Sequence, residues 1–278
     1  MGHSPLRRFV AELVPKFRED QVAILESFIR HVVEESGRRG VVLGLSGGLD
    51  SAVVATLCAR AIGRERVLAL GLPEGDGGSD LADAKRFAKG LGIAFRVIDI
   101  GPVVASLETA LNARKAGRVA RGNLRARARM TVLYFVGNAE DRLVMGTGNK
   151  SEIACGYFTK FGDGGADFLP IGDLYKTQVQ AMALHLGLPK RIRDKVPTAG
   201  LWATQTDEGE LGIAYEDLDR VLLGLELQLA PDAIAEKTRV PAREVRRIER
   251  LVAASAHKRK APLIPKLGVR TFGLDWRE

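Results

Sequence analysis

The sequence has few cysteines and no long apolar segment. Among its 278 residues only Cys58 and Cys155 could pair, which is too few for a disulfide framework, and no Cys/His cluster has the spacing of a zinc site. No apolar run approaches the ~20 residues that span a bilayer, and the first residues carry no signal-peptide pattern. We therefore expect a globular, cytoplasmic protein without a structural metal or a membrane partner.

The charge balance is strongly positive. The formal net charge is +8 and the pI is about 9.6, which indicates anionic partners. Basic residues gather in the stretches 114–129, 239–250 and 258–260. RNA-binding surfaces usually interleave aromatic side chains for base stacking, and these stretches contain none. A dinucleotide and ATP would account for the charge equally well, so composition leaves both kinds of partner open.

Short apolar runs and amphipathic stretches alternate along the first half of the chain. This alternation predicts an α/β fold, a doubly wound parallel sheet of about five strands with flanking helices and right-handed crossovers. A C-terminal helical segment of two short helices follows residue 231. The strands that we expect cover residues 41–45, 66–72, 94–100 and 142–149, and the helices cover residues 19–35, 52–62, 81–92, 102–115, 123–138 and 174–189.

The stretch 41–51, VVLGLSGGLDS, has the pattern of a strand, a glycine turn and a helix start. Such a turn directs backbone N–H groups toward one point, which suits phosphate binding. It is not a Walker A loop, because no lysine is present to reach the phosphates. Asp50 beside a phosphate site makes sense if a divalent cation lies between the two anions. The alternative is an ordinary glycine turn capped by Ser46 and Asp50.

Polar, glycine-rich segments follow three of the expected strands. They are SGGLDS, LPEGDGGSD and GTGNKSE, at residues 46–51, 72–80 and 146–152. In open parallel sheets the ligand lies beyond the carboxyl ends of the strands, near the point where the strand order reverses. We therefore expect the three segments to converge on one crevice.

Several motifs together resemble a known family. SGGLDS resembles the pyrophosphate-binding loop of the N-type ATP pyrophosphatases. The segments GTGNKSE, YFTKFGDGGADFLPIGDLYKTQV, PTAGLWATQTDEGELGIAYEDLD and HKRKAPLIP are similar, in order and spacing, to the ammonia-dependent NAD synthetases, from about residue 19 to the C-terminus. The resemblance implies an adenine nucleotide α-hydrolase-like fold. It also implies ATP-dependent amidation of deamido-NAD by ammonia, through an acyl-adenylate, to give NAD, AMP and pyrophosphate.

The resemblance also implies an ATP site with Mg2+ as cofactor. Asp50 and Glu152 match the family's magnesium carboxylates, and Asp50 and Lys176 are the implied catalytic residues. From the residues alone, Glu152 could simply be a helix-start carboxylate and Lys176 a solvated lysine. The implied ATP-binding residues are Gly44, Leu45, Ser46, Gly47, Gly48, Leu49, Asp50, Ser51, Thr147, Lys176 and Thr198.

A second set of residues is implied for deamido-NAD. Arg127 matches the family's dinucleotide-binding arginine, whereas Arg125 and Arg129 share another helix face that we expect to be solvated. Phe158 could stack on the nicotinate ring or pack in the core. The implied deamido-NAD residues are Arg127, Lys160, Asp167, His257 and Lys258.

The resemblance covers the chain as one domain, residues 1–278. Residues 1–36 would be an N-terminal helical segment, 37–190 the nucleotide-binding α/β core and 191–278 a lid loop with the C-terminal helices. About 40 residues precede the ATP motif, too few for an amidase domain, so we expect free ammonia as the nitrogen source unless a separate chain delivers it.

Members of the family are homodimers, and helix 123–138 has more apolar surface than one sheet face needs. We therefore expect a homodimer, although a fully buried core helix would have the same pattern.

The alternative function is an RNA-modifying ATP pyrophosphatase that acts on tRNA. Its sulfur-transferring members need a pair of active cysteines, and Cys58 lies in an apolar helical stretch, so we expect no nucleic-acid partner.

Overall fold

The computed structural model describes residues 13–198, 200, 202 and 205–270. In this part of the chain four strands form one parallel sheet, in the order β3-β2-β1-β4. The strands are β1 (Gly40–Gly44), β2 (Val67–Gly71), β3 (Ala94–Val97) and β4 (Arg142–Met145). Val41 is in register with Val67 on one side and Leu143 on the other. The strand order therefore reverses beside β1, between β1 and β4.

The sheet differs from the prediction in its number of strands. About five were expected, and the described residues form four, with one further parallel bridge between Met145 and Phe168 beyond β4. β4 ends at Met145, earlier than expected, because the next residues turn into a short helix, α6 (Lys150–Cys155). β3 ends at Val97 for a similar reason, since α4 (Gly101–Ala110) begins four residues later.

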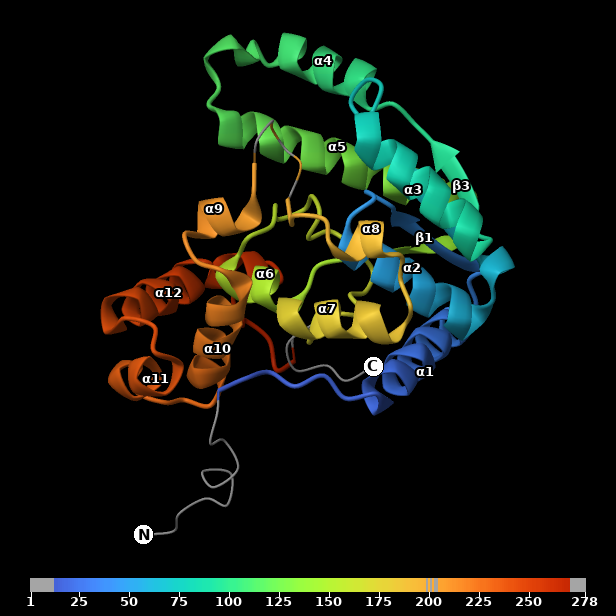
Figure 1. Ribbon diagram of the computed structural model, residues 1–278. Helices are drawn as coiled ribbons and strands as arrows, with labels where there is room; N and C mark the ends of the chain where they lie inside the picture. The colour runs from blue at the N-terminus through green and yellow to red at the C-terminus, as the bar shows by residue number, and fades with distance from the viewer. Residues whose placement is uncertain (1–12, 199, 201, 203–204, 271–278) are drawn as a thin grey trace.

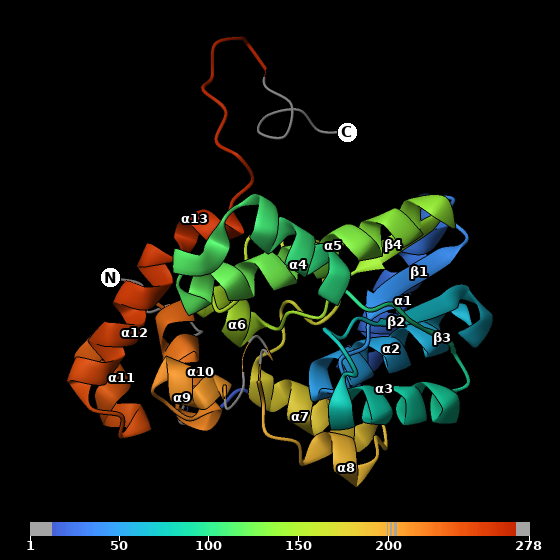
Figure 2. The same ribbon diagram turned by 90° about the horizontal axis from the view of Figure 1, so that it is seen from above.

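Helices cover both faces of the sheet, as a doubly wound fold requires (Figures 1 and 2). On one face Val41 and Leu43 pack in a cluster with α2 (Leu49–Ile62) and α1 (Asp20–Glu35). On the other face Val42 packs against α5 (Arg118–Ala139). Because successive strand residues point to opposite faces, a run of β-branched residues builds both clusters at once. The remaining elements of this unit are α3 (Gly78–Leu91), α7 (Lys176–His185), α8 (Lys190–Arg193) and the 3₁₀ turns η2 (Arg64–Arg66) and η3 (Ala113–Lys115).

The C-terminal helices form a second apolar cluster beside the sheet unit (Figure 1). The helices in it are α9 (Asp207–Leu211), α10 (Tyr215–Glu226), α11 (Pro231–Thr238) and α12 (Ala242–Ala254). A short exposed helix, α13 (Ala256–Arg259), follows α12. The two short helices expected after residue 231 are confirmed as α11 and α12, whereas α9 and α10 were not predicted. Cys155 and Tyr175 from the preceding unit pack in the same cluster, so the two parts share their interior.

Both cysteines are free and buried, in α2 and at the end of α6. Burial raises the pKa of the Cys58 thiol and raises that of Cys155 to about 12, so neither is a ready nucleophile. Within the described residues, no helix has both the length and the apolar character needed to cross a membrane.

Candidate active site

The phosphate-loop motif joins β1 to α2 as the sequence predicts. Gly47 has φ +79°, and a Cβ atom there would lie 2.4 Å from the carbonyl oxygen of Asp80 on α3. Glycine is therefore required both for the backbone conformation and for the close approach of α3. The turn places the start of α2 at the carboxyl end of β1, beside the point where the strand order reverses.

The alternative of a turn capped by Ser46 and Asp50 holds for Ser46 within the turn but not for Asp50. The N-cap of α2 is Gly48, and in the described structure no side chain caps that position. The Ser46 hydroxyl lies 3.1 Å from the Ser51 hydroxyl and accepts a hydrogen bond from the Gly48 N–H, so it organises the loop itself. Asp50 points to other partners. The start of α2 can therefore receive an anion.

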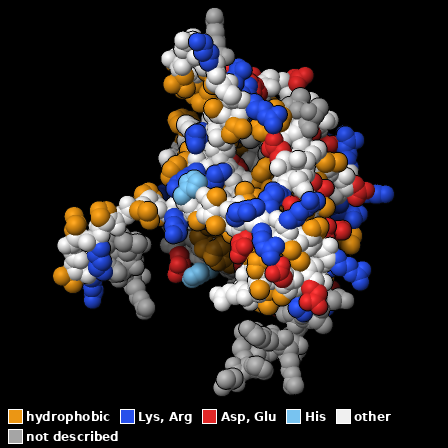
Figure 3. Space-filling model, turned by 90° about the vertical axis from the view of Figure 1, so that its left-hand side faces the viewer, with side chains coloured by type: hydrophobic (Ala, Val, Ile, Leu, Met, Phe, Trp, Pro, Cys, Tyr) orange, Lys and Arg blue, Asp and Glu red, His pale blue; other side chains and the backbone are white. Residues whose placement is uncertain are grey.

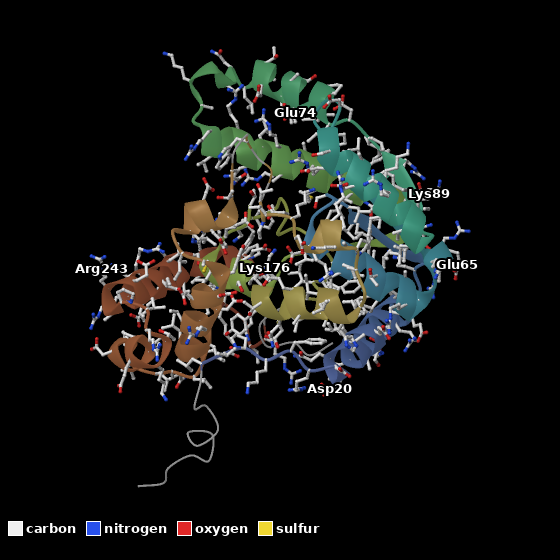
Figure 4. The ribbon with its side chains drawn as sticks, in the orientation of Figure 1. Asp20, Glu65, Glu74, Lys89, Lys176 and Arg243 are labelled. Carbon is white, nitrogen blue, oxygen red and sulfur yellow. The ribbon has the colours of Figure 1, made fainter. Side chains whose placement is uncertain are left out.

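Asp50 and Glu152 meet across one lysine, Lys176. The Lys176 ammonium donates a hydrogen bond to the Asp50 carboxylate, and its nitrogen lies 3.8 Å from Glu152 Oε1. The side chain of Lys176 is only 2% exposed, which excludes the solvated lysine that the sequence alone favoured. Figure 4 shows Lys176 at the centre of the molecule, at the start of α7. The three charged groups come from three segments far apart in the sequence.

Glu152 is the helix-start carboxylate that the residues alone suggest, and it also faces Lys176. In a capping box at the start of α6, its Oε2 accepts a hydrogen bond from the Asn149 N–H at 3.2 Å, and the Asn149 side chain accepts one from the Glu152 N–H. The other carboxylate oxygen faces Lys176. The Asn149 side-chain amide also donates to Asp50 Oδ1 at 3.4 Å, which links the turn after β4 to the phosphate loop.

Asp219 of α10 fixes the two helices that carry Lys176 and Glu152. It is fully buried and accepts hydrogen bonds from the Ser151 hydroxyl and from the N–H and hydroxyl of Thr177. Ser151 precedes Glu152, and Thr177 follows Lys176. The sequence analysis did not select Asp219. A signal was present, since an aspartate lies on the apolar face of α10 beside Leu218 and Leu222, where a charge requires buried partners.

Tyr215 and Asp207, which the sequence analysis did not select, also lie near Lys176. Its ammonium lies 5.4 Å from the centre of the Tyr215 ring, and the Tyr215 hydroxyl donates to Asp207 Oδ2 at 3.1 Å. Asp207 is 3% exposed and lines the same cavity as Lys176. The acidic run DEGEL, which contains it, was the available sequence signal.

Burial and neighbouring charges shift the pKa values of this cluster. Burial and the Asp50 charge raise the pKa of the Glu152 carboxyl to about 8, against the opposing effect of Lys176. Burial alone would lower the pKa of Lys176, but the two carboxylates raise it above its usual value. Among the described residues no group of three or more His, Cys, Asp or Glu forms a complete metal cage. Two carboxylates together with substrate phosphates and water are nevertheless an ordinary donor set for Mg2+.

A cavity of about 1560 Å³ joins these groups. Its walls come from the ends of β1, β2 and β4, the start of α2, one side of α5 and several of the described residues between Arg193 and Glu210. It is larger than the ~300–1,000 Å³ of a usual ligand pocket, so it has room for ATP and part of a second substrate. Of the residues implied for ATP and Mg2+, those that line it are Gly44, Leu45, Ser46, Gly48, Leu49, Asp50, Ser51, Thr147, Glu152, Lys176 and Thr198.

The residues implied for deamido-NAD form a separate, outer group, of which Lys258 alone lines this cavity. An Arg127 guanidinium nitrogen donates to the Lys160 carbonyl at 3.3 Å, and the Lys160 ammonium donates to the His257 carbonyl at 2.8 Å. Asp167 accepts from the Tyr134 hydroxyl at 3.1 Å and from the Val144 N–H at 2.7 Å. These contacts place α5, the loop after α6 and α13 side by side.

The prediction for Arg125 and Arg129 is wrong. Both line the cavity, whereas Arg127 lies on the exposed side of α5. Arg129 donates to the Leu72 carbonyl at 3.0 Å and is largely buried, which lowers its pKa. Arg125 pairs with Glu74, which is labelled in Figure 4. Val136 and Ala128 pack inward, and this packing fixes how α5 is rotated about its axis. The sequence alone did not show which arginines this rotation would place over the cavity.

Lys258 and Phe158 also lie together at the inner edge of the outer group. The Lys258 ammonium donates to the Gly156 and Phe158 carbonyls at 2.7 and 2.9 Å and lies 5.6 Å from the Phe158 ring centre. Phe158 lines the cavity, so its ring is available to a ligand and is not a core residue.

Fold and site together define a class of proteins, the nucleotide-binding α/β proteins whose phosphate loop follows the first strand and whose ligand lies at the carboxyl edge of the sheet. The NAD synthase family model matches residues 21–262. The NH(3)-dependent NAD(+) synthetase of Methanosarcina mazei is 46% identical over 243 residues, which cover 86% of this chain and 95% of that protein. The chain therefore belongs to the NAD synthase family.

Solved structures agree with this assignment. NMN synthetase from Francisella tularensis has 36% identity and a TM-score of 0.79, over 90% of this chain and 99% of that one. NH3-dependent NAD synthetase from Campylobacter jejuni, in complex with nitrate, has 32% identity and a TM-score of 0.76, over 89% and 98% of the two chains. The adenine nucleotide α-hydrolase-like fold expected from the motifs is thereby confirmed.

Proposed function

We propose that this site joins ammonia to the nicotinate carboxylate of deamido-NAD, with ATP as co-substrate, and releases NAD, AMP and pyrophosphate. The observation that carries the proposal is the meeting of Asp50, Glu152 and Lys176 beside an uncapped phosphate loop, in a chain of the NAD synthase family. A carboxylate does not exchange oxygen for ammonia at neutral pH without activation. The site therefore needs ATP to activate it.

The reaction divides into two transfers. A carboxylate oxygen of the substrate forms a bond to the α-phosphorus of ATP, and the bond to pyrophosphate breaks. Ammonia nitrogen then bonds to the acyl carbon, AMP leaves with the electron pair of the broken C–O bond, and the nitrogen loses a proton. Phosphoryl transfer depends mainly on positioning and on charge stabilisation. The loop N–H groups would hold the pyrophosphate, and Lys176 would stabilise the charge that develops at the α-phosphate.

We propose Mg2+ as the cofactor, with Asp50 and Glu152 as its protein ligands. When bound, the ion would neutralise phosphate charge next to these carboxylates. The proposal is supported by the two carboxylates that meet at Lys176 beside the uncapped phosphate loop. Manganese binding followed by electron paramagnetic resonance tests it without turnover, because Glu152→Gln should weaken binding while an exposed substitution, Glu236→Gln, should not.

The outer group, Arg127, Lys160, Asp167, His257 and Lys258, is proposed to bind deamido-NAD. Arg127 and His257 are exposed, and they lie on the outer side of α5 and on α13. A substrate that reaches from this group into the cavity would extend past Phe158.

We further propose a homodimer that covers this face of α5. The proposal is supported by Phe135, whose relative exposure is 72%.

The homodimer can be tested directly. Sedimentation velocity should give twice the chain mass for the unmodified protein, and Phe135→Asp should shift the equilibrium toward the monomer. A monomer at all concentrations would remove this part of the proposal.

We place the reaction in the cytoplasm, where ATP is supplied. We also propose that the chain acts as one domain, because Cys155 and Tyr175 pack among the C-terminal helices.

The substrate is tested by product analysis with ¹⁵N-ammonium. The proposal predicts ¹⁵N-labelled NAD, AMP and pyrophosphate in equal amounts when deamido-NAD is supplied. Nicotinate mononucleotide must be tested in parallel, because one structural relative carries the name NMN synthetase. If kcat/KM is higher with nicotinate mononucleotide than with deamido-NAD, the mononucleotide is the substrate and the proposal of deamido-NAD fails.

The RNA-modifying alternative is not favoured. Cys58 is fully buried, so it cannot serve as an active thiol in sulfur transfer. On the face seen in Figure 3, Lys and Arg side chains are interspersed with acidic and apolar ones and form no continuous stripe. Salt-sensitive tRNA binding with a steep log-log slope would be required to revive this alternative.

A further inference from the structure

The phosphate loop contains no lysine of its own, but the structure brings one to it. Lys195 follows α8, three residues before Thr198, and its ammonium nitrogen lies 3.1 Å from the Gly47 carbonyl oxygen inside the loop. Its side chain is 22% exposed and lines the same cavity as Ser46, Gly48 and Asp50. The sequence places it almost 150 residues from the loop.

Lys176 cannot supply all the positive charge that the phosphates of ATP need. It already faces two carboxyl groups at one end of the loop, those of Asp50 and Glu152. Backbone N–H groups contribute only partial charges. Lys195 approaches the loop from its other end, at Gly47. A pyrophosphate on the loop would therefore meet a cation from each end.

The present partners of Lys195 leave it able to bind a ligand. Its ammonium lies 2.7 Å from Asp80 Oδ1, and the Asp80 side chain is 52% exposed. An ion pair with a half-exposed carboxylate is weakened by water, whereas a phosphate is a strong partner for a lysine ammonium. The neighbouring Asp83 lies 3.9 Å away and already pairs with Arg86 and Arg191, so it does not need Lys195.

We propose that Lys195 is a pyrophosphate-binding residue, which donates to the phosphates of ATP that leave as pyrophosphate and so replaces the lysine missing from the loop. This assignment rests on the proposed ATP-dependent function. The competing role is a tether, in which Lys195 only ties the segment after α8 to α3 through Asp80. If Lys195 binds pyrophosphate, only its own substitution should weaken pyrophosphate binding. If it is a tether, substitution of Asp80 should weaken binding as well.

The test is calorimetric binding of inorganic pyrophosphate, with Mg2+ present and no other substrate. Loss of one charge-assisted hydrogen bond should weaken binding by about tenfold or more in Lys195→Gln. Lys195→Arg should restore part of it. The matched control is Lys190→Gln on α8, which removes the same charge from an 82% exposed side chain that does not line the cavity. Asp80→Asn breaks the ion pair but keeps Lys195, and it should leave binding unchanged or tighter. Melting curves of all variants report on folding.

Two results would overturn the assignment. One is pyrophosphate affinity within twofold of the unmodified protein in Lys195→Gln. The other is an equal loss in Asp80→Asn and Lys195→Gln, which would establish the tether. If the unmodified protein bound neither pyrophosphate nor ATP, the proposed function itself would fail, and this outcome is distinct from a failure confined to Lys195.

Discussion

The inner and outer groups of the site are built differently. In the inner group, Lys176 is buried, Asp50 and Glu152 are each 18% exposed, and the two carboxylates face the lysine through their side chains. The outer group is more exposed, and Arg127 and Lys160 bond to backbone carbonyls of their neighbours. A preorganised charged cluster suits chemistry that every turnover repeats. The outer side chains are available to exchange these bonds for bonds to a substrate, so we assign specificity to them.

Breaking the inner group should have the largest effect. Asp50→Asn removes one carboxylate of the pair that faces Lys176 and is proposed to bind Mg2+, so kcat/KM should fall by about a hundred- to thousandfold or more. The measurement is steady-state NAD formation, with circular dichroism as the check on folding. Asp232→Asn, the same change at an exposed side chain, serves as the control. Near-normal turnover in Asp50→Asn would remove Asp50 from the reaction.

The next effect should come from Asp219, which acts on the inner group from behind. Asp219→Ala leaves the buried hydroxyl of Ser151 and the N–H of Thr177 without their acceptor, and it should destabilise the fold by about 2–4 kcal/mol. Because Lys176 and Glu152 adjoin these donors, kcat should fall more than the KM for ATP rises. Urea unfolding and kinetics measure the two effects. Lost stability with an unchanged kcat would make Asp219 a purely structural residue.

A change in the outer group should separate binding from chemistry. Arg127→Ala should raise the KM for deamido-NAD by about tenfold, the size of one charge-assisted hydrogen bond, and leave the KM for ATP unchanged. Arg38→Ala, which removes an arginine far along the sheet from the cavity lining, is the control. An equal rise in both KM values would mean that the two groups are not separate.

The smallest effect should come from Tyr134→Phe. The variant loses one hydrogen bond to the exposed Asp167, and the KM for deamido-NAD should rise by about two- to fivefold. Burial and the Asp167 charge raise the pKa of Tyr134 to about 12, so the hydroxyl stays protonated and donates up to at least pH 9. The KM for deamido-NAD of Tyr134→Phe, divided by that of the unmodified protein, should therefore be the same at pH 7 and pH 9. A ratio that changes over this range would contradict the hydrogen bond.

The sheet unit was largely predictable from the sequence. Its strands and helices alternate with the expected periodicities, and the glycine turn of residues 46–51 lies where the motif predicts. The strand count was less certain, because a segment such as the one around Phe168 can pair by a single bridge. The sequence analysis did not predict α10, although Leu218, Val221 and Leu222 have helical spacing there.

Charged residues of the site were harder to predict, since their environment depends on distant segments. Lys176 is buried only because Asp50 and Glu152 converge on it, and Lys195 reaches the loop only because α8 packs near α2 and α3. Arg125 and Arg129 were assigned to the wrong surface because spacing shows which arginines share a face but not what covers it. The ligand roles of all these residues stay predictions.

Exchange of labelled pyrophosphate into ATP, without ammonia, tests the central claim most directly. The account predicts rapid exchange that requires deamido-NAD, is lost in Asp50→Asn and is recovered in Arg127→Ala at high deamido-NAD concentration. Exchange that ignores deamido-NAD, or that appears only with tRNA, would contradict it.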